Sequence, residues 1–174
     1  MVKHRSILVT FLAAAAVATP TAAVAQTAPG ERLLEGTQIV NRADGNAVST
    51  YGNSSGDTYA ISLRTTDWPN HNTRWVISGP PDAVQIRTDR PDTRCLEPFD
   101  KKTQLNQKVV VRSCDGSDAQ RWTLRREDGG GYLISPWKAQ DLAVAPEAVS
   151  ASWTFLALTH AVPVPPRLWN FSTR

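Results

Sequence analysis

The sequence has few of the residues that build metal centres and reactive thiol sites. Only two of its 174 residues are cysteines and three are histidines. Two cysteines are too few for a four-thiolate zinc site or a disulfide-dense miniature scaffold. The formal net charge is only +3, and two of the basic residues lie in a segment that we expect to be removed. A nearly neutral chain lacks the concentrated positive charge of a nucleic-acid-binding domain, so no nucleic acid is expected as a partner.

Long apolar runs are also missing after the first 25 residues, so no membrane span is expected there. Before that point, Lys3 and Arg5 precede an apolar run over residues 7–18, and Ala23-Val24-Ala25 follows. This order is typical of a secretory signal peptide cleaved near Ala25. The alternative is a membrane anchor, but the run is too short to cross a bilayer comfortably. The expected organisation of this secreted (extracellular or periplasmic) protein is a signal peptide over 1–25, a leader over 26–36 and one folded domain over 37–174.

Export also favours a structural disulfide between Cys95 and Cys114, because two cysteines this close in sequence pair readily outside a reducing cytosol. A loop of this length contributes about 3 kcal/mol in the chain-entropy model. The alternative is a redox-active or nucleophilic thiol. It finds little support, because neither His71 nor His160 is placed near a cysteine by the sequence.

Three tryptophans mark an internal repeat. Trp75, Trp122 and Trp169 are spaced 47 residues apart, and each opens a short apolar segment. An isoleucine precedes each of them by 36, 36 and 35 residues. These isoleucines are Ile39, Ile86 and Ile134. Self-similarity at one period indicates a repeat architecture whose units share one core. A Trp at a fixed position in every unit is expected to be a core residue with its indole N–H bonded to a backbone carbonyl.

Short strands separated by turn residues fill each repeat. Residues 59–63, 109–111 and 153–158 are rich in β-branched and aromatic side chains, and glycine-containing turn clusters separate such segments. No segment after the first 25 residues has helical periodicity over ten residues or more. Three repeats of about four strands predict an all-β domain, a single β-trefoil. The alternative is a two-sheet sandwich, which has no reason to repeat three times.

The middle repeat carries recognisable motifs. Cys95-Leu96-Glu97 is followed by Cys114 and then by Gln120-Arg121-Trp122. This pattern resembles the ricin-B-type lectin family of β-trefoils, which has a Cys-Leu-Asp-like start, a second cysteine and a Gln-x-Trp motif. The resemblance covers residues 33–174. It implies a β-trefoil fold, carbohydrate binding and no cofactor.

The resemblance also implies a sugar site with four groups. These are an acid after the first cysteine, an aromatic residue two positions before the second cysteine, and an Asn-Gln pair before the Trp. In the middle repeat the positions hold Glu97, Arg112, Ala119 and Gln120. Glu97, Arg112 and Gln120 are therefore candidate ligand-binding residues. The alternative is a solvated surface cluster, since exposed charges usually have no further role.

The other two repeats depart further from that pattern. In the first repeat Asn72 keeps the Asn position and is a candidate ligand-binding residue, while Ser49 and Thr73 stand at the acid and Gln positions. In the third repeat Ala143 and Pro166 are assigned to the acid and Asn positions. No repeat has the complete set, so a galactose-type site is not expected.

Three tryptophans lie outside the repeat positions. Trp68 lies in a polar loop, which suits ligand or partner contact, so it is also a candidate ligand-binding residue. Trp137 follows a strand, and it anchors a recognition surface if it faces solvent. For both residues the alternative is partial burial under a loop. Trp153 begins an apolar strand and is expected in the core.

These observations lead to a secreted, non-catalytic, lectin-like module that recognises a glycan or a glycosylated cell surface. The alternative is a cell-binding or accessory subunit that docks onto a protein partner, as in cytolethal distending toxins, whose cell-binding subunits resemble the same trefoil family. An enzyme is not expected. The chain has no Gly-rich phosphate loop, no His-x-x-x-His metal pair and no Gly-x-Ser-x-Gly nucleophile turn.

Overall fold

The computed structural model describes residues 34–52, 57–67 and 72–173, which form an all-β domain of twelve strands and three short 3-10 helices. The first repeat contains β1 (Leu34–Asn41), β2 (Ala47–Gly52), β3 (Thr58–Leu63) and β4 (Trp75–Ser78). The second contains β5 (Val84–Thr88), β6 (Arg94–Pro98), β7 (Val109–Ser113) and β8 (Arg121–Arg126). The third contains β9 (Tyr132–Pro136), β10 (Leu142–Pro146), β11 (Trp153–His160) and β12 (Trp169–Thr173). The short helices are η1 (Phe99–Lys101), η2 (Asp118–Gln120) and η3 (Pro165–Arg167).

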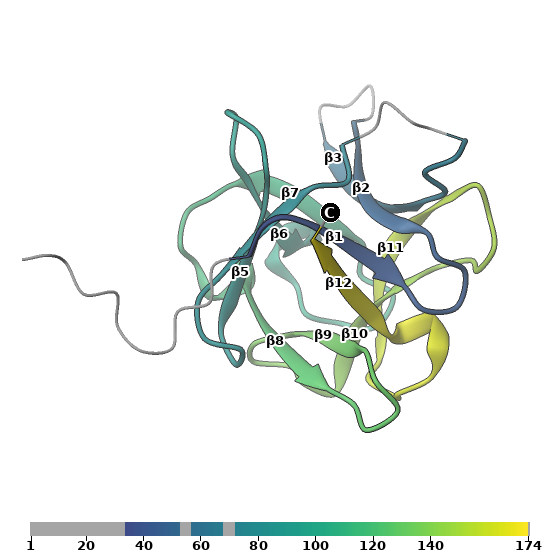
Figure 1. The fold of residues 1–174 in the computed structure, drawn as a ribbon. Coiled ribbons are helices and arrows are strands. Elements are labelled where there is room, and N and C mark those ends of the chain that lie inside the picture. Colours follow the sequence, from purple (N-terminus) through teal and green to yellow (C-terminus); the bar gives the residue numbers. More distant parts are fainter. Residues whose placement is uncertain (1–33, 53–56, 68–71, 174) are drawn as a thin grey trace, which may run out of the picture.

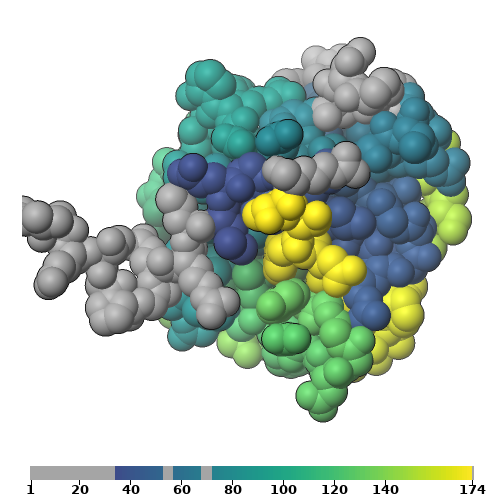
Figure 2. Space-filling view, in the orientation of Figure 1, coloured from purple at the N-terminus to yellow at the C-terminus, as the bar shows by residue number. Residues whose placement is uncertain are grey.

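The first and last strands of the three repeats pair in a closed antiparallel ring (Figure 1). The order around the ring is β1, β4, β5, β8, β9 and β12. The ring closes where β12 pairs with β1, with Thr37 opposite Thr173 and Asn41 opposite Trp169. Figure 2 shows these two strands side by side at one face, β1 in purple and β12 in yellow. The first and last strands of the domain are therefore hydrogen-bonded to each other.

The two middle strands of each repeat form a hairpin, and the three hairpins meet. β2 pairs with β3, β6 with β7, and β10 with β11. β3 also pairs with both β11 and β7, and a bridge between Lys108 and Ala157 links the second and third hairpins. A six-stranded ring capped by three hairpins is a β-trefoil. The predicted all-β trefoil of three repeats is confirmed, and the two-sheet sandwich is excluded.

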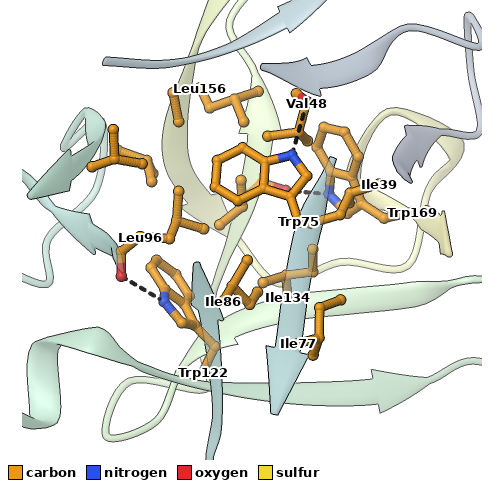
Figure 3. Close-up of a cluster of buried hydrophobic side chains, with 14 of the residues drawn as sticks. Ile39, Val48, Trp75, Ile77, Ile86, Leu96, Trp122, Ile134, Leu156 and Trp169 are labelled. Atoms are coloured by element: carbon orange, nitrogen blue, oxygen red, sulfur yellow. Dashed lines mark hydrogen bonds between the residues drawn. The ribbon is translucent and has the colours of Figure 1, made fainter. Parts of the chain in front are cut away.

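The three motif tryptophans lie in equivalent places at the centre of the fold (Figure 3). The exposed fraction of Trp75, Trp122 and Trp169 is 1% or less. Each indole Nε1–H donates to a backbone carbonyl of a hairpin strand, at 2.9, 3.0 and 2.9 Å respectively. Their acceptors are Val48 O, Leu96 O and Val144 O. Since each bond joins the ring to its own hairpin, the predicted core role of these residues is confirmed.

Two details differ from the sequence-based expectations. The first strand begins at Leu34, inside the segment expected to be a leader, because Leu34 pairs with Ile77 of β4. Trp153 is 40% exposed, so its expected place in the core is wrong. Side chains alternate between the two faces of β11, and the buried Leu156 and Leu158 take the core face.

In the described part of the chain, no helix is both long enough and apolar enough to span a membrane.

Candidate functional site

The indole hydrogen bonds identify the equivalent acid position in each repeat. The residue after each carbonyl acceptor is Ser49, Glu97 or Ala145. The acid position of the third repeat is therefore Ala145, and its assignment to Ala143 is wrong. The interval between acceptor and Trp shortens from 27 to 26 to 25 residues along the chain. No single sequence spacing can therefore align all three repeats.

Glu97 is a buried carboxylate in the middle repeat. It lies on β6 with an exposed fraction of 1%, and Gln120 is fully buried beside it. The Gln120 Nε2 amide donates to Glu97 Oε2 at 2.9 Å. The structure therefore brings these two predicted site residues together in the interior. The alternative of a solvated surface cluster is wrong for both.

Gln120 is itself held by the backbone around it. Its Nε2 amide also donates to Ser113 O at 2.9 Å, and its Oε1 accepts a hydrogen bond from the backbone N–H of Asp115 at 2.9 Å. Both amide protons and the carbonyl oxygen are thus engaged. Because Gln120 cannot rotate without breaking these bonds, it fixes the orientation of the Glu97 carboxylate.

The predicted disulfide supports the same segment. Cys95 and Cys114 are bonded, with their Cα atoms 5.0 Å apart. The bond joins β6 to the residue that follows β7, between Ser113 and Asp115. The prediction of a structural disulfide is confirmed, and the alternative of a free reactive thiol is excluded. The bond anchors the two backbone groups that hold Gln120.

An open polar cleft of about 460 Å³ lies over Glu97. Charged residues of both signs line most of it, namely Asp57, Arg94, Glu97, Lys101, Arg112 and Asp115. Arg112 connects several of these groups. Its Nη2 lies 3.1 Å from Asp57 Oδ1, its Nε lies 3.6 Å from Glu97 Oε1, and its guanidinium lies over the Phe99 ring at 5.4 Å. Arg112 therefore stands at the rim of the cleft in contact with the buried acid.

Lys101 and Asp115, which also line the cleft, form an ion pair. Lys101 Nζ donates to Asp115 Oδ2 at 2.5 Å. This hydrogen bond, together with those from Ser117, holds the pKa of the Asp115 carboxyl below its ordinary value. The same contact raises the pKa of the Lys101 ammonium. Both groups therefore keep their charge across the neutral range and place a paired ammonium and carboxylate at the cleft.

In the first repeat, the residues at the equivalent positions are engaged in hydrogen bonds with their neighbours. Ser49 is buried and its hydroxyl donates to Asn72 O at 2.8 Å. The Asn72 side chain accepts from the backbone N–H of Arg74 at 3.0 Å, and Gln38 donates to Thr73 Oγ1 at 2.7 Å. Asn72 thus shapes the turn into the motif Trp, away from Glu97 and Gln120. Trp68 lies outside the described residues.

Sequence reasoning missed a surface aromatic cluster over the hairpins. Its members are Tyr51, Tyr59, Phe99, Trp153 and Phe155, with neighbouring ring centroids 5.2 to 6.1 Å apart. Tyr51 and Trp153 are 42% and 40% exposed. Only the alternation of Trp153 and Phe155 on one strand signals it in the sequence. Trp137 is not part of the cluster; it is half-buried, and the Arg121 guanidinium and the Lys138 ammonium lie 5.3 and 5.1 Å from its ring.

The cleft chemistry suits recognition of hydroxyl groups. Carboxylate oxygens accept hydrogen bonds, and guanidinium and ammonium groups donate them. Glu97 pairs with Arg112, and Asp115 pairs with Lys101, so the groups are already oriented before a ligand arrives. Within residues 34–52, 57–67 and 72–173, no cluster of His, Cys, Asp and Glu side chains is arranged to hold a metal ion.

The comparisons with known proteins agree with this geometry. The family model of the ricin-type β-trefoil lectin domain matches residues 35–160. The chain therefore belongs to the ricin-type β-trefoil lectin family. No curated protein sequence matches it.

Solved structures share the fold at low sequence identity. ThreeFoil, a designed three-fold symmetric protein, is 18% identical with a TM-score of 0.68, over 79% of this chain and 98% of its own. The C-half of an earthworm R-type lectin, solved with GalNAc, is 10% identical with a TM-score of 0.60, over 81% and 100%. A chain of the Haemophilus ducreyi cytolethal distending toxin is 13% identical with a TM-score of 0.61, over 79% and 83%.

Proposed function

We propose that the protein is a secreted, non-catalytic carbohydrate-binding module that captures a saccharide in the middle-repeat cleft. Membership of the ricin-type lectin family supports the ligand class. The observation that carries the site is the buried Glu97 carboxylate, held by Gln120 at 2.9 Å beneath an open polar cleft. A buried charge is costly unless it is paired and hydrogen-bonded, so its retention favours a role in binding.

The cleft holds a sugar by hydrogen bonds at its floor and at its rim. Sugar hydroxyls donate to the Glu97 carboxylate at the floor, while Arg112 and Lys101 donate to ring and hydroxyl oxygens. Because Gln120 and the disulfide fix the floor, little side-chain entropy is lost on binding. The aromatic position of the family pattern holds Arg112, so hydrogen bonding replaces stacking as the main contact. This difference separates the cleft from a galactose-type site.

Glycan-array screening followed by calorimetric titration of the best saccharide tests the proposal. Glu97→Gln keeps the side-chain shape but removes the charge, and we expect affinity to fall about tenfold or more, since hydrogen bonds to charged groups contribute roughly 1.5–3 kcal/mol. Glu127→Gln is the matched control, because Glu127 pairs with Arg125 at 2.8 Å away from the cleft residues. A thermal melt of each variant verifies folding.

Two outcomes contradict the proposal. One is the absence of saccharide binding at millimolar concentration across the array. The other is a folded Glu97→Gln variant that binds as tightly as the parent protein. Export is tested separately, by N-terminal sequencing of protein recovered from the periplasm or medium. Cleavage near Ala25 is the expected result, and the Cys95–Cys114 disulfide supports an oxidising compartment.

As a second candidate function, the module docks onto a protein partner as an accessory subunit. The surface aromatic cluster favours it, because exposed Tyr and Trp side chains are enriched at binding hot spots. Trp153 and Tyr51 stack at 5.4 Å on the outer face of the hairpins. Native co-purification, repeated with Tyr51→Ser plus Trp153→Ser, tests this function. A defined complex that the double variant loses is the expected result, and recovery of only the free monomer contradicts it.

A further inference from the structure

The third repeat contains a second cleft, of about 340 Å³. It corresponds to the middle-repeat cleft, because Ala145 stands at the position of Glu97 and Arg167 at the position of Gln120. Residues from β10, β11, η3 and the loop before β7 line it. The polar and charged residues among them are Asn106, Glu147, Thr159 and Arg167.

The walls of this third-repeat cleft are fixed by hydrogen bonds. Asn41 of β1 is buried and donates its Nδ2 amide to Pro166 O at 2.9 Å, which ties η3 to the barrel. On the other side, the backbone N–H of Asn106 donates to Leu158 O, and the N–H of Leu158 donates to Gln107 O, both at 2.8 Å. The cleft is therefore organised before a ligand binds.

Its charge differs from that of the middle repeat. There, the Gln120 amide meets the protein's own carboxylate, Glu97, at 2.9 Å. In the third repeat the acid is replaced by Ala145 and the amide by the guanidinium of Arg167. The exchange removes a negative charge and adds a positive one. No ion pair to Arg167 is formed by any residue that the structure describes.

The acidic residue in this cleft is already neutralised. Glu147 forms an ion pair with Lys108 Nζ, and Lys108 also lies over the Phe155 ring at 4.8 Å. Because Lys108 neutralises Glu147, the positive charge of Arg167 is left without a counter-charge among the residues that line the cleft. A guanidinium in a preformed cleft is the group that best pairs with a carboxylate, since it offers two parallel N–H donors.

We infer that the third-repeat cleft is a second binding site, and that it takes a sugar carrying a carboxylate. The ligand supplies the acid that Ala145 no longer provides. Its carboxylate pairs with Arg167, and its hydroxyls bond to Asn106 and Thr159 at the rim. The saccharide class rests on the proposed function, whereas the site and its charge preference are separate from the middle-repeat cleft.

The test is an NMR titration of the isotope-labelled protein with named probes. D-Glucuronate, D-galacturonate and N-acetylneuraminate are the acidic sugars, D-glucose and D-galactose the neutral ones, and acetate the bare carboxylate. We expect the acidic sugars to shift the resonances of Asn106 and Arg167. Arg167→Gln, which restores the middle-repeat residue at that position, should weaken binding about tenfold.

Two further variants sharpen the test. Ala145→Glu places an internal carboxylate beside Arg167, so it should compete with the ligand and also weaken binding of acidic sugars. Arg126→Gln removes an exposed arginine on β8 and should leave their affinity unchanged. Because the two cleft variants change different residues, a folding defect in one does not remove the test.

Several results overturn the inference. Neutral sugars and acetate should leave these resonances unshifted, so equal shifts from either would refute the preference for acidic sugars. Equal affinity of the folded Arg167→Gln variant would refute the site. Uronate binding that Glu97→Gln abolishes and Arg167→Gln preserves would place the ligand in the middle-repeat cleft. That last result would support the proposed function while refuting this second site.

Discussion

Each repeat has one buried indole hydrogen bond, so the contribution of this bond to stability can be measured and compared between the three repeats. Replacing Trp122 by Phe removes the Nε1–H that donates to Leu96 O at 3.0 Å. Trp122 is fully buried and Leu96 is 2% exposed, so the carbonyl that loses its donor is shielded from bulk water. Trp75→Phe and Trp169→Phe remove the equivalent bonds at 2.9 Å. The three substitutions therefore perturb the same physical interaction in three repeats.

The expected cost has two parts. Leaving a buried acceptor unpaired costs about 1–3 kcal/mol. The smaller phenyl ring leaves a cavity that adds about 1–2 kcal/mol. A total near 3 kcal/mol should lower Tm by about 6–12 °C in a domain of this size. Since the environments are equivalent, the three variants should agree with one another to within about 1 kcal/mol, which is the ordinary spread of such contributions.

Chemical denaturation and thermal melts measure these changes directly. Trp137→Phe is the control, because the Trp137 ring is half-buried beside Arg121 and Lys138 and its substitution keeps an aromatic ring for both cations. It should cost less than about 1 kcal/mol. A loss at Trp122 no larger than at Trp137 would refute the core role. A large loss in one repeat with none in the others would refute the threefold equivalence.

Two further predictions concern the middle repeat. Breaking the Cys95–Cys114 bond, which closes a separation of 19 residues, should lower the unfolding free energy by about 3 kcal/mol and weaken saccharide binding. Urea unfolding and titration with and without reductant measure both effects, and an unchanged midpoint would contradict the first. Asp115 contributes stability above its ordinary pKa of about 3.9, because Lys101 depresses that pKa in the folded state, and the contribution is lost as pH falls. Asp115→Asn should therefore flatten the acid side of the Tm–pH curve, and a curve parallel to the parent's would contradict this.

Much of the fold could be predicted because its signals are local and repeated. The motif tryptophans and the isoleucines before them mark strand positions three times, and errors at one repeat are corrected by the other two. The Cys95–Cys114 pair followed from export and proximity in sequence. The start of β1 at Leu34 did not, because a strand edge depends on its partner Ile77 in β4.

Sequence reasoning named three of the residues at the candidate cleft, but not their environment. Sequence placed Glu97, Arg112 and Gln120 together through the family pattern. It could not show that Glu97 and Gln120 are buried while Arg112 is at the rim, since burial depends on how β6, β7 and η2 pack. The burial of Trp153 also depends on packing: the sequence placed this residue in the core, whereas β11 turns it to the outer face.

The order of residues by itself determined a three-unit β-trefoil with one disulfide and with tryptophans at its centre. Periodicity and side-chain chemistry can be read from the sequence alone, so no contact information is needed to detect them. Only the tertiary structure decided which acid position each repeat presents and how the aromatic cluster assembles. It also decided that Ala145 stands in the third repeat where the middle repeat has an acid, and that Arg167 lines the same cleft. Those properties depend on side chains from different hairpins meeting in space, and the intervals between them along the chain are not constant.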